Sequence, residues 1–530
     1  MQLEIGNPYA SRRSPVMARQ MVSTSQPLAT AAGLEMLRRG GNAVDAALAA
    51  AITLPVVEPT GNGLGSDAFC ILWDGVSLHG LNASGHSPAS WTPERFAGLG
   101  AMPRRGFDSV TVPGAVSAWV DLSSRFGRLP FEELFEPAVR YAEEGYPVSP
   151  IIAEQWRRGA AELHSQPGFA QTFMPEGRAP RAGEIFRSAE MARTLRLIAE
   201  SRGEAFYRGE LAERIQAFAT EHGAAITAAD MAAHTNDWCG TIEQGFGDAA
   251  LHEIPPNGQG IAALMALGML KGSGIEDLDP DGPEALHLQI EAMKLAFMDI
   301  HAFVADQLSM DEVTASHLLD PAYLASRAAL IDRTRAREYP VGAPRDGGTV
   351  CLAAADADGM MVSFIQSNYA GFGSGVVVPG TGISLQNRAF GFSTKAGHPN
   401  QVGPGKRPFH TIIPGFVMGA DGPSMAFGLM GGPMQAQGHV QMMLRTHVWG
   451  QDPQMAADAP RWRVIAGLDV AIEATTRPHT VSRLADMGHR LTVEPDTAGF
   501  GFGGAQLIRK VGEVYIAGSD PRKDGMAAGF

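Results

Sequence analysis

The residues around Thr349 could provide a nucleophile and a base in one amino acid. A segment punctuated by proline and glycine, residues 333–348, ends in Gly347-Gly348, and an apolar stretch then runs from Thr349 to Ala355. If the chain is cut between Gly348 and Thr349, the threonine gains a free α-amine beside its own hydroxyl. An α-amine has a pKa of about 8, which suits proton transfer near neutral pH. The alternative is that Thr349 is a β-prone residue that opens a hairpin.

A second candidate for chemistry is the glycine pair in Met430-Gly431-Gly432-Pro433. It follows an apolar predicted strand and precedes a predicted helix. Glycines at such a position let backbone N–H groups approach a ligand without obstruction, as an oxyanion hole requires. We therefore interpret Gly431 and Gly432 as candidate oxyanion donors, with a plain strand-to-helix turn as the alternative.

Motifs for cofactors and metals are incomplete or missing in the sequence. Gly371-Phe372-Gly373-Ser374-Gly375 is followed by a predicted strand, whereas a dinucleotide loop leads into a helix. Asp356-Ala357-Asp358-Gly359 lacks the glutamate of a calcium loop and is interpreted as a hairpin turn. Neither His-Glu-x-x-His nor paired Cys-x-x-Cys occurs, so the sequence predicts no metal and no cofactor.

Charge and hydrophobicity argue against several classes of partner. The formal net charge is -14, and no basic run is longer than a pair, so neither nucleic acid nor an anionic membrane is an expected partner. The 3 cysteines, an odd number, fit a reducing compartment. Residues 1–20 lack the apolar core of a signal peptide, and no apolar stretch is long enough for a membrane span. These features predict a cytoplasmic protein.

The elements that must position these residues follow from hydrophobic periodicity and turn signals. Helices are predicted over residues 28–39, 42–54, 134–144, 188–200, 204–219, 285–306, 437–449 and 479–487. Strands are predicted over residues 21–27, 68–73, 350–355, 360–366, 375–378, 410–417, 424–429 and 505–509. Helices cluster early and strands late, which indicates sheets covered by helices in a layered α/β or α+β architecture.

The longest predicted helix, residues 285–306, carries three charged residues on its amphipathic pattern. Glu291, Lys294 and Asp299 could form ion pairs on a solvated helix face or contact a neighbouring helix. The first interpretation requires nothing beyond helical spacing, and the sequence leaves both open.

Many short motifs, in order along the chain, resemble the γ-glutamyltransferase (γ-glutamyltranspeptidase) family of N-terminal-nucleophile hydrolases. None is strong alone, but together they run nearly end to end. The matching motifs are Gly41-Asn42-Ala43-Val44-Asp45-Ala46-Ala47, Val57-Glu58-Pro59, Val112-Pro113-Gly114, Phe206-Tyr207-Arg208-Gly209, Glu291-Ala292-Met293-Lys294-Leu295-Ala296, Gly371-Phe372-Gly373-Ser374-Gly375, Pro379-Gly380-Thr381-Gly382-Ile383, Asp458-Ala459-Pro460-Arg461 and Gly518-Ser519-Asp520-Pro521-Arg522.

This resemblance implies an α+β fold, the four-layer αββα sandwich, and a precursor that cuts itself at Gly348–Thr349. The products would be a large subunit (1–348) and a small subunit (349–530) that together form one structural unit, with a homodimer of such heterodimers left open. Thr349 would attack an amide carbonyl, Gly431 and Gly432 would supply the oxyanion hole, and Ser367 would support the nucleophile. Water or an acceptor amine would then release the acyl group.

The chain departs from the family pattern where the substrate is held. Val350 replaces a second threonine, and no arginine lies near Ser84, where the family grips the α-carboxylate; His86 is the nearest polar candidate. Phe390-Gly391 replaces the acidic pair that holds the α-amine, and His410-Thr411 replaces two serines. A zwitterionic glutamyl group needs both a cation and an anion. The residues proposed to bind substrate are Ser84, His86, Asn368, Tyr369, Arg388, His410 and Thr411, of which Asn368, Arg388 and His410 could hold a carboxylate.

Three hypotheses follow from the sequence. The first is a self-cleaving amide hydrolase that acts on glutathione or a related γ-glutamyl amide. The second keeps the chemistry but changes the substrate to another small amidated acid, such as oxamate, or to an acylated amine, as in the acylases of the wider family. Residues 363–369 resemble a glutathione-hydrolase-like bacterial branch without a secretion signal. The third hypothesis is an uncleaved, inactive relative that acts as a binding protein.

Overall fold

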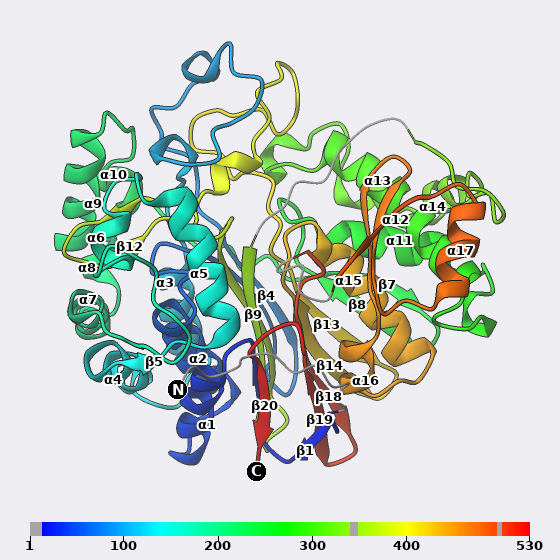
Figure 1. The fold of residues 1–530 in the computed structure, drawn as a ribbon, viewed down its shortest axis with the longest axis horizontal. Coiled ribbons are helices and arrows are strands. Elements are labelled where there is room, and N and C mark those ends of the chain that lie inside the picture. The colour runs from blue at the N-terminus through cyan, green and yellow to red at the C-terminus, as the bar shows by residue number, and fades with distance from the viewer. Residues whose placement is uncertain (1–12, 340–347, 496–500) are drawn as a thin grey trace.

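Two antiparallel sheets form the centre of the protein (Figure 1). The computed structural model describes residues 13–339, 348–495 and 501–530, and for residues 348–350 it describes the backbone alone. The seven-stranded sheet runs in the order β1 (Val16–Ala18), β19 (Val514–Ser519), β18 (Ala505–Val511), β14 (Gly422–Leu429), β13 (Pro414–Gly419), β8 (Ala249–Glu253) and β7 (Ile242–Phe246). The six-stranded sheet runs in the order β20 (Met526–Gly529), β2 (Met21–Thr24), β9 (Gly348–Ala355), β10 (Met361–Tyr369), β3 (Asp67–Trp73) and β4 (Leu78–Ala83).

Period-two alternation explains how one strand serves two layers. On β9, Cys351, Ala353 and Ala355 pack between the two sheets. Leu352 and Ala354, which alternate with them, pack against helices on the outer face of the same sheet. Successive side chains of a strand point to opposite faces, so a strand buried on both sides is apolar throughout.

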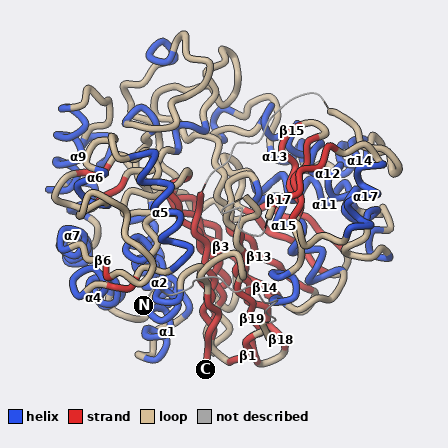
Figure 2. Tube along the Cα trace, in the orientation of Figure 1, coloured by secondary structure: helices blue, strands red, loops and turns tan. Residues whose placement is uncertain are grey.

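Helices cover both outer faces of the pair of sheets, as Figure 2 shows in blue on either side of the red strands. Beside the six-stranded sheet lie α1 (Pro27–Arg38), α2 (Ala43–Val57), α3 (Ala115–Phe126), α4 (Glu136–Glu144), α5 (Pro150–Leu163), α6 (Phe169–Phe173), α7 (Ala189–Glu200), α8 (Glu204–Arg208), α9 (Glu210–Glu221) and α10 (Ala228–Ala232). Beside the seven-stranded sheet lie α11 (Gly260–Leu270), α12 (Pro283–Phe303), α13 (Ala315–Leu318), α14 (Pro321–Ala328), α15 (Met434–Met443), α16 (Pro453–Asp458) and α17 (Pro478–Asp486). The predicted four-layer αββα sandwich of the α+β class is confirmed.

The hairpin predicted after Thr349 is present. Strands β9 and β10 are joined by a turn in which the Asp358 N–H donates to Asp356 Oδ1 at 3.0 Å and the Gly359 N–H donates to the Asp356 carbonyl at 3.2 Å. The segment that resembles a calcium loop is therefore a hairpin turn. Strand β9 also pairs with β2, so residues far apart in the sequence share one sheet.

Three predicted elements differ clearly from the structure. The helix predicted over residues 204–219 is divided into α8 and α9 at Gly209, whose backbone is extended (φ -132°, ψ -149°). The helix predicted over residues 437–449 is α-helical only to Met443 and continues as a π-helix over Leu444–Val448. The strand predicted over residues 410–417 begins only at Pro414, because the Ile413 N–H donates to the distant Gln435 side chain (3.0 Å) instead of a neighbouring strand, a contact that local periodicity does not report.

The solvated face suggested for residues 285–306 is wrong. Glu291, Lys294 and Asp299 on α12 are all buried, with at most 6% of any of the three exposed. Lys294 pairs with Glu291 within the helix, and Asp299 pairs with Arg327 on α14. The alternative, contact with a neighbouring helix, is confirmed for Asp299.

Candidate active site

The start of β9 lies opposite a bulge in β10. Gly348 pairs with Tyr369, but the register shifts between this pair and the next, so Ser367 and Asn368 both lie opposite Thr349 alone. An extra residue of this kind bends a strand and occurs preferentially next to active sites. The fold therefore brings four of the predicted site residues, Thr349, Ser367, Asn368 and Tyr369, to one sheet position.

Tyr369 ends β10 in an unusual backbone conformation. Its φ is 77°, in the left-handed region that bulky residues rarely adopt. The Ser367 hydroxyl helps to hold this conformation, because it accepts a hydrogen bond from the Tyr369 N–H at 2.7 Å. Backbone strain of this type concentrates at ligand-binding sites, where the surrounding structure maintains it.

The predicted glycine turn lies between β14 and α15. Gly431 and Gly432 have φ values of 110° and 58°, so both positions favour glycine. Within the described part of the chain, their N–H groups donate no hydrogen bond. The turn also lies close to β9, since the Met430 N–H and the Cys351 thiol both donate to the carbonyl of Gly504, at 3.1 and 3.6 Å.

Gln259, which the sequence reasoning missed, braces this turn. Its Nε2 donates to the carbonyls of Gly432 (2.8 Å) and Thr411 (2.6 Å), and the side chain is buried. It lies just before α11, at the end of Pro-Pro-Asn-Gly. That sequence signals a turn, but nothing local indicates which carbonyls the following glutamine would reach.

Arg388 is a buried cation with most of its hydrogen-bonding capacity unused. The residue is 1% exposed, and its Nη1 donates to Thr411 Oγ1 at 3.0 Å. The guanidinium carbon lies 4.8 Å from the centroid of the Tyr369 ring, a cation–π contact. Among the described residues, neither Nε nor Nη2 has a hydrogen-bond partner. Buried polar groups are normally paired, so this exception points to a ligand.

Asp67 and His410 lie beside this arginine. Asp67 Oδ2 is 3.2 Å from His410 Nε2, and Oδ1 accepts hydrogen bonds from the N–H groups of Gly85 (3.2 Å) and Gly114 (3.1 Å). Asp67 opens β3 after a glycine-rich segment, and the sequence reasoning did not select it. The sequence did contain a signal for this residue, because a carboxyl group at the start of an otherwise apolar strand is unusual and indicates a specific role.

Burial controls the protonation of this cluster. It raises the pKa of Asp67 to about 7, although Arg388 and the two N–H groups act in the opposite direction. Burial also lowers the pKa of Arg388 to about 10, with Asp67 partly opposing. Burial and the nearby Arg388 hold the pKa of His410 well below its ordinary value, so His410 is neutral at physiological pH.

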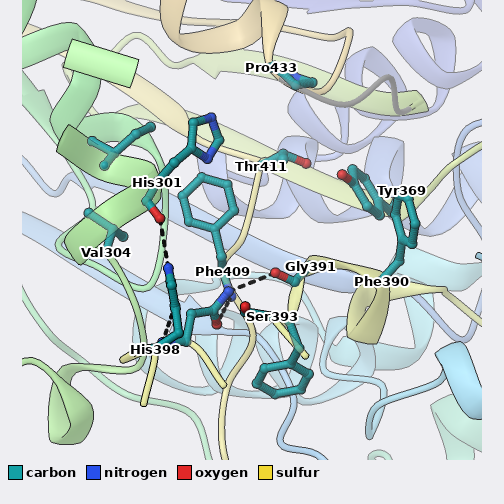
Figure 3. Close-up of a pocket in the computed structure, with 13 residues that line it drawn as sticks. His301, Val304, Tyr369, Phe390, Gly391, Ser393, His398, Phe409, Thr411 and Pro433 are labelled. Carbon is teal, nitrogen blue, oxygen red and sulfur yellow. Dashed lines mark hydrogen bonds between the residues drawn. The ribbon is translucent and has the colours of Figure 1, made fainter. Parts of the chain in front are cut away.

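A cavity of about 330 Å³ opens beside these residues (Figure 3). Its wall reaches the features described above through four residues. Tyr369 belongs to the bulge of β10, Phe390 and Thr411 lie next to Arg388 in sequence or by hydrogen bond, and Pro433 belongs to the glycine turn. The other lining residues are Ile300, His301, Val304, Gly391, Phe392, Ser393, His398, Asn400 and Phe409. This lining combines aromatic and apolar side chains with the polar side chains of His301, Ser393, His398, Asn400 and Thr411, and its described residues include no carboxylate.

Five of the seven residues predicted to bind substrate lie outside that lining: Arg388 and His410, described above, and Asn368, Ser84 and His86. Asn368 accepts a hydrogen bond from Ser66 (2.9 Å) and donates to Ser384 (3.0 Å). Ser84 is fully buried, where it donates to Asn82. Burial, with Arg407 nearby, lowers the pKa of His86 to about 4. The Asn368 and Ser84 side chains thus already have hydrogen-bond partners within the fold.

A separate polar cluster lies on α12. His287, Glu291 and His489 have potential metal-ligand atoms within 4.8 Å of one another, and this is the one such group among the described residues. None of the three lines the cavity beside Tyr369. No helix in the described ranges is long and apolar enough to span a membrane.

Comparison with characterised proteins identifies relatives over the whole length. The chain is 36% identical to the Glutathione hydrolase-like YwrD proenzyme of Bacillus subtilis, covering 98% of this chain and 100% of the relative. It is also 36% identical to the Oxamate amidohydrolase proenzyme of Klebsiella pneumoniae, covering 98% and 99%. The crystal structure of cephalosporin acylase from Bacillus halodurans superposes with a TM-score of 0.95 at 46% identity, covering 100% and 99%.

The family match agrees with these relatives. Residues 29–530 match the family described as Gamma-glutamyltranspeptidase. The resemblance inferred from the motifs is confirmed, since both the full-length relatives and the αββα fold agree with it. The chain belongs to the gamma-glutamyltranspeptidase family, and it is a hydrolase of that family that acts on amide bonds.

Proposed function

We propose that the protein cuts itself between Gly348 and Thr349 and that Thr349 then hydrolyses the amide of a small carboxylic acid. The observation that carries this proposal is the position of the Thr349 backbone, at the start of β9 opposite the bulge of β10. The cut would produce a large subunit of residues 1–348 and a small subunit of residues 349–530. Both contribute strands to both sheets, so they would stay together.

The proposed reaction uses an acyl-enzyme. The Thr349 hydroxyl attacks the amide carbonyl carbon, and its α-amine accepts the hydroxyl proton and passes it to the leaving amine. An ester of Thr349 forms, and water or an acceptor amine releases the acyl group. The N–H groups of Gly431 and Gly432 would stabilise the oxyanion, because they have no other partner in the described structure. Ser367, which supports the backbone of Tyr369, would hold the bulge beside the nucleophile.

The favoured substrate carries a carboxylate and no α-amine. A carboxylate bound against Thr411 would face a hydroxyl that already accepts from Arg388, so the hydroxyl proton is available to the ligand. The guanidinium behind it supplies the positive charge. A glutamyl α-amine would require an anion, and no carboxylate belongs to the described residues that line the cavity. An amidated acid of the oxamate type therefore fits better than glutathione, which is the alternative substrate.

Intact mass spectrometry before and after incubation tests the nucleophile. We expect wild type to give two fragments that meet at Gly348/Thr349, and Thr349→Ser, which keeps a hydroxyl, to do the same. Thr349→Ala should remain one inactive chain of 56.1 kDa. Two fragments from Thr349→Ala would show that another agent makes the cut. A wild-type chain that stays intact and inactive would favour the binding-protein alternative.

Steady-state kinetics of the cleaved enzyme test the substrate. We expect kcat/KM for oxamate to exceed that for glutathione. Glutathione has an α-amine that would lack an anionic partner in the site, whereas oxamate has no α-amine. A larger kcat/KM for glutathione would contradict this substrate class while leaving the nucleophile assignment intact. Addition of an acceptor dipeptide would then separate hydrolysis from transfer.

A further inference from the structure

A buried carboxylate on α12 holds the segment that leads to the predicted cleavage site. Glu291 is fully buried, and its Oε1 accepts a hydrogen bond from Lys294 Nζ at 2.6 Å. Its Oε2 accepts hydrogen bonds from the Arg337 N–H and the Tyr339 hydroxyl, both at 3.1 Å. Two of the three donors thus belong to the last described residues before residues 340–347. We call residues 332–339 the strap.

The strap is fixed at two further points. The Ala336 N–H donates to the carbonyl of Met487, just after α17, at 2.7 Å. His287 Nε2 lies 2.7 Å from the carbonyl of Asp332, and because a carbonyl only accepts, this nitrogen carries the proton. His287 Nδ1 lies 2.9 Å from His489 Nε2, so both ring nitrogens of His287 have hydrogen-bond partners. Burial lowers the pKa of His489 to about 3, so the His489 ring is neutral.

The same assignments argue against a metal ion among His287, Glu291 and His489. Both ring nitrogens of His287 already have hydrogen-bond partners, and both oxygens of Glu291 accept hydrogen bonds. The Lys294 ammonium beside Glu291 would repel a cation. The cluster is better explained as an anchor that joins α12 to the strap.

We infer that Glu291 is a positioning residue for self-cleavage, an inference that rests on the proposed function. Anchored at Tyr339, the chain has only residues 340–347 to reach the Gly348–Thr349 bond. Fewer residues between an anchor and the bond mean that less entropy is lost when the bond is aligned for attack. Helix α12 also contributes Ile300 and His301 to the cavity lining. The same helix therefore fixes the position of Glu291 relative to the cavity.

The step that the anchor assists is an acyl shift followed by hydrolysis. The Thr349 hydroxyl attacks the carbonyl carbon of Gly348 and loses its proton, the Gly348–Thr349 C–N bond breaks, and the Thr349 nitrogen takes up a proton. Water then hydrolyses the resulting ester, which leaves a Gly348 carboxylate and the free Thr349 hydroxyl. Once the bond is cut, alignment of the strap no longer matters to substrate turnover.

The test measures the rate of precursor cleavage against turnover by the mature enzyme. Tyr339→Phe removes one strap hydrogen bond, and we expect it to slow cleavage about five-fold. Glu291→Gln should slow cleavage at least as much. Tyr323→Phe is a matched control, because Tyr323 donates to Asp299 on the same helix (2.8 Å) from outside the strap. Glu284→Gln, an exposed glutamate on α12, is the control for the charge change.

The outcomes separate the inference from the proposed function. Slower cleavage in Tyr339→Phe and Glu291→Gln, with normal controls and an unchanged kcat after maturation, would support the anchor. Wild-type cleavage rates in both variants, or equal slowing in Tyr323→Phe, would overturn it while the nucleophile assignment stands. A wild-type chain that is never cut at Gly348 would overturn both. If Glu291→Gln does not fold, Tyr339→Phe alone decides, with thermal unfolding as the check on stability.

Discussion

Two largely buried arginines in this protein have opposite hydrogen-bonding environments. Arg522, near the C-terminus, donates to both Glu473 and Asp520 and to the carbonyls of Ala457 and Ala459. The guanidinium of Arg388, beside the cavity, donates to Thr411 alone among the described residues. Both belong to segments that the sequence reasoning selected. Arg388 is 1% exposed and the Arg522 side chain is 10% exposed, so most of each side chain is removed from water.

The electrostatics follow from those partners. Burial by itself lowers the pKa of Arg522, but Asp520 and Glu473 raise that pKa overall. Burial lowers the pKa of Arg388 to about 10, because Asp67 opposes it only in part. An arginine whose donors are all satisfied stabilises a fold, whereas one with unused donors is available to a ligand. By this difference in hydrogen-bond partners we assign a structural role to Arg522 and a proposed ligand-binding role to Arg388.

The largest predicted effect is on stability at Arg522. Arg522→Met would leave the buried Glu473 without its cation, and Asp520 would keep only its pair with Arg461. The loss should lower the free energy of unfolding by about 3 kcal/mol or more. Chemical denaturation of the cleaved protein measures this change. The control is Arg477→Met, because Arg477 pairs with Asp279 on the surface and exposed pairs contribute about 1 kcal/mol or less. Equal losses in the two variants would contradict the comparison.

At Arg388 we predict a loss of substrate binding with little loss of stability. Arg388→Met should raise KM for a carboxylate substrate about 10- to 100-fold, the range for a charge-assisted contact. The free energy of unfolding should stay within about 1 kcal/mol of wild type, since the buried cation has few partners to lose. Arg388→Lys should recover part of the affinity.

A neutral amide of similar size is the control for Arg388→Met. Its KM should not change, because it has no carboxylate for the guanidinium to attract. An equal rise in KM for the neutral amide would contradict a role of Arg388 in binding a carboxylate. A loss in the free energy of unfolding as large as that of Arg522→Met would show that Arg388 is structural, and the contrast between the two arginines would not hold.

The smallest predicted effect is a pH dependence from Asp67. Since its pKa is about 7, Asp67 loses its proton as pH rises from 6 to 8, and the new negative charge offsets that of Arg388. KM for an acid substrate should therefore rise several-fold across this range. The free energy of unfolding should fall over a related pH range. Because the pKa of Asp67 is higher in the folded protein than its ordinary value of 3.8, the stability that protonated Asp67 contributes is lost as pH rises from 3.8 to about 7.

Asp67→Asn should remove the rise in KM, because the amide does not ionise. The pH profile of kcat, which we assign to the Thr349 α-amine, should remain. A KM profile that is unchanged in Asp67→Asn would show that another group titrates.

Local patterns predicted much of the fold. Period-two alternation and turn residues located the β9–β10 hairpin, and Gly431-Gly432 marked the turn before α15. The two large sheets were not predicted as such, because their neighbours come from distant parts of the chain; β9, for example, pairs with β2. The break at Gly209 was not predicted, because the helix propensity of one residue does not show where the chain must turn.

The site was predicted less completely than the fold. Tyr369, Arg388, His410 and Thr411 were selected and lie together. Asp67 and Gln259 were missed, because their partners lie on other segments and no spacing in the sequence relates them. The sequence left open whether Glu291 lies on a solvated face or contacts a neighbouring helix, since an amphipathic pattern does not reveal that the strap covers the polar side of its helix.

The sequence by itself determined the family, the fold class and the candidate nucleophile, because ordered motifs and local periodicity are properties of neighbouring residues. Tertiary structure alone decided which buried charges are satisfied. Among the described residues, the Arg388 guanidinium donates to one group and the Arg522 guanidinium to several. This difference depends on groups that folding brings from distant segments into a medium where each unpaired charge is costly. That distribution of partners, which no local pattern encodes, distinguishes the proposed binding site from the structural core.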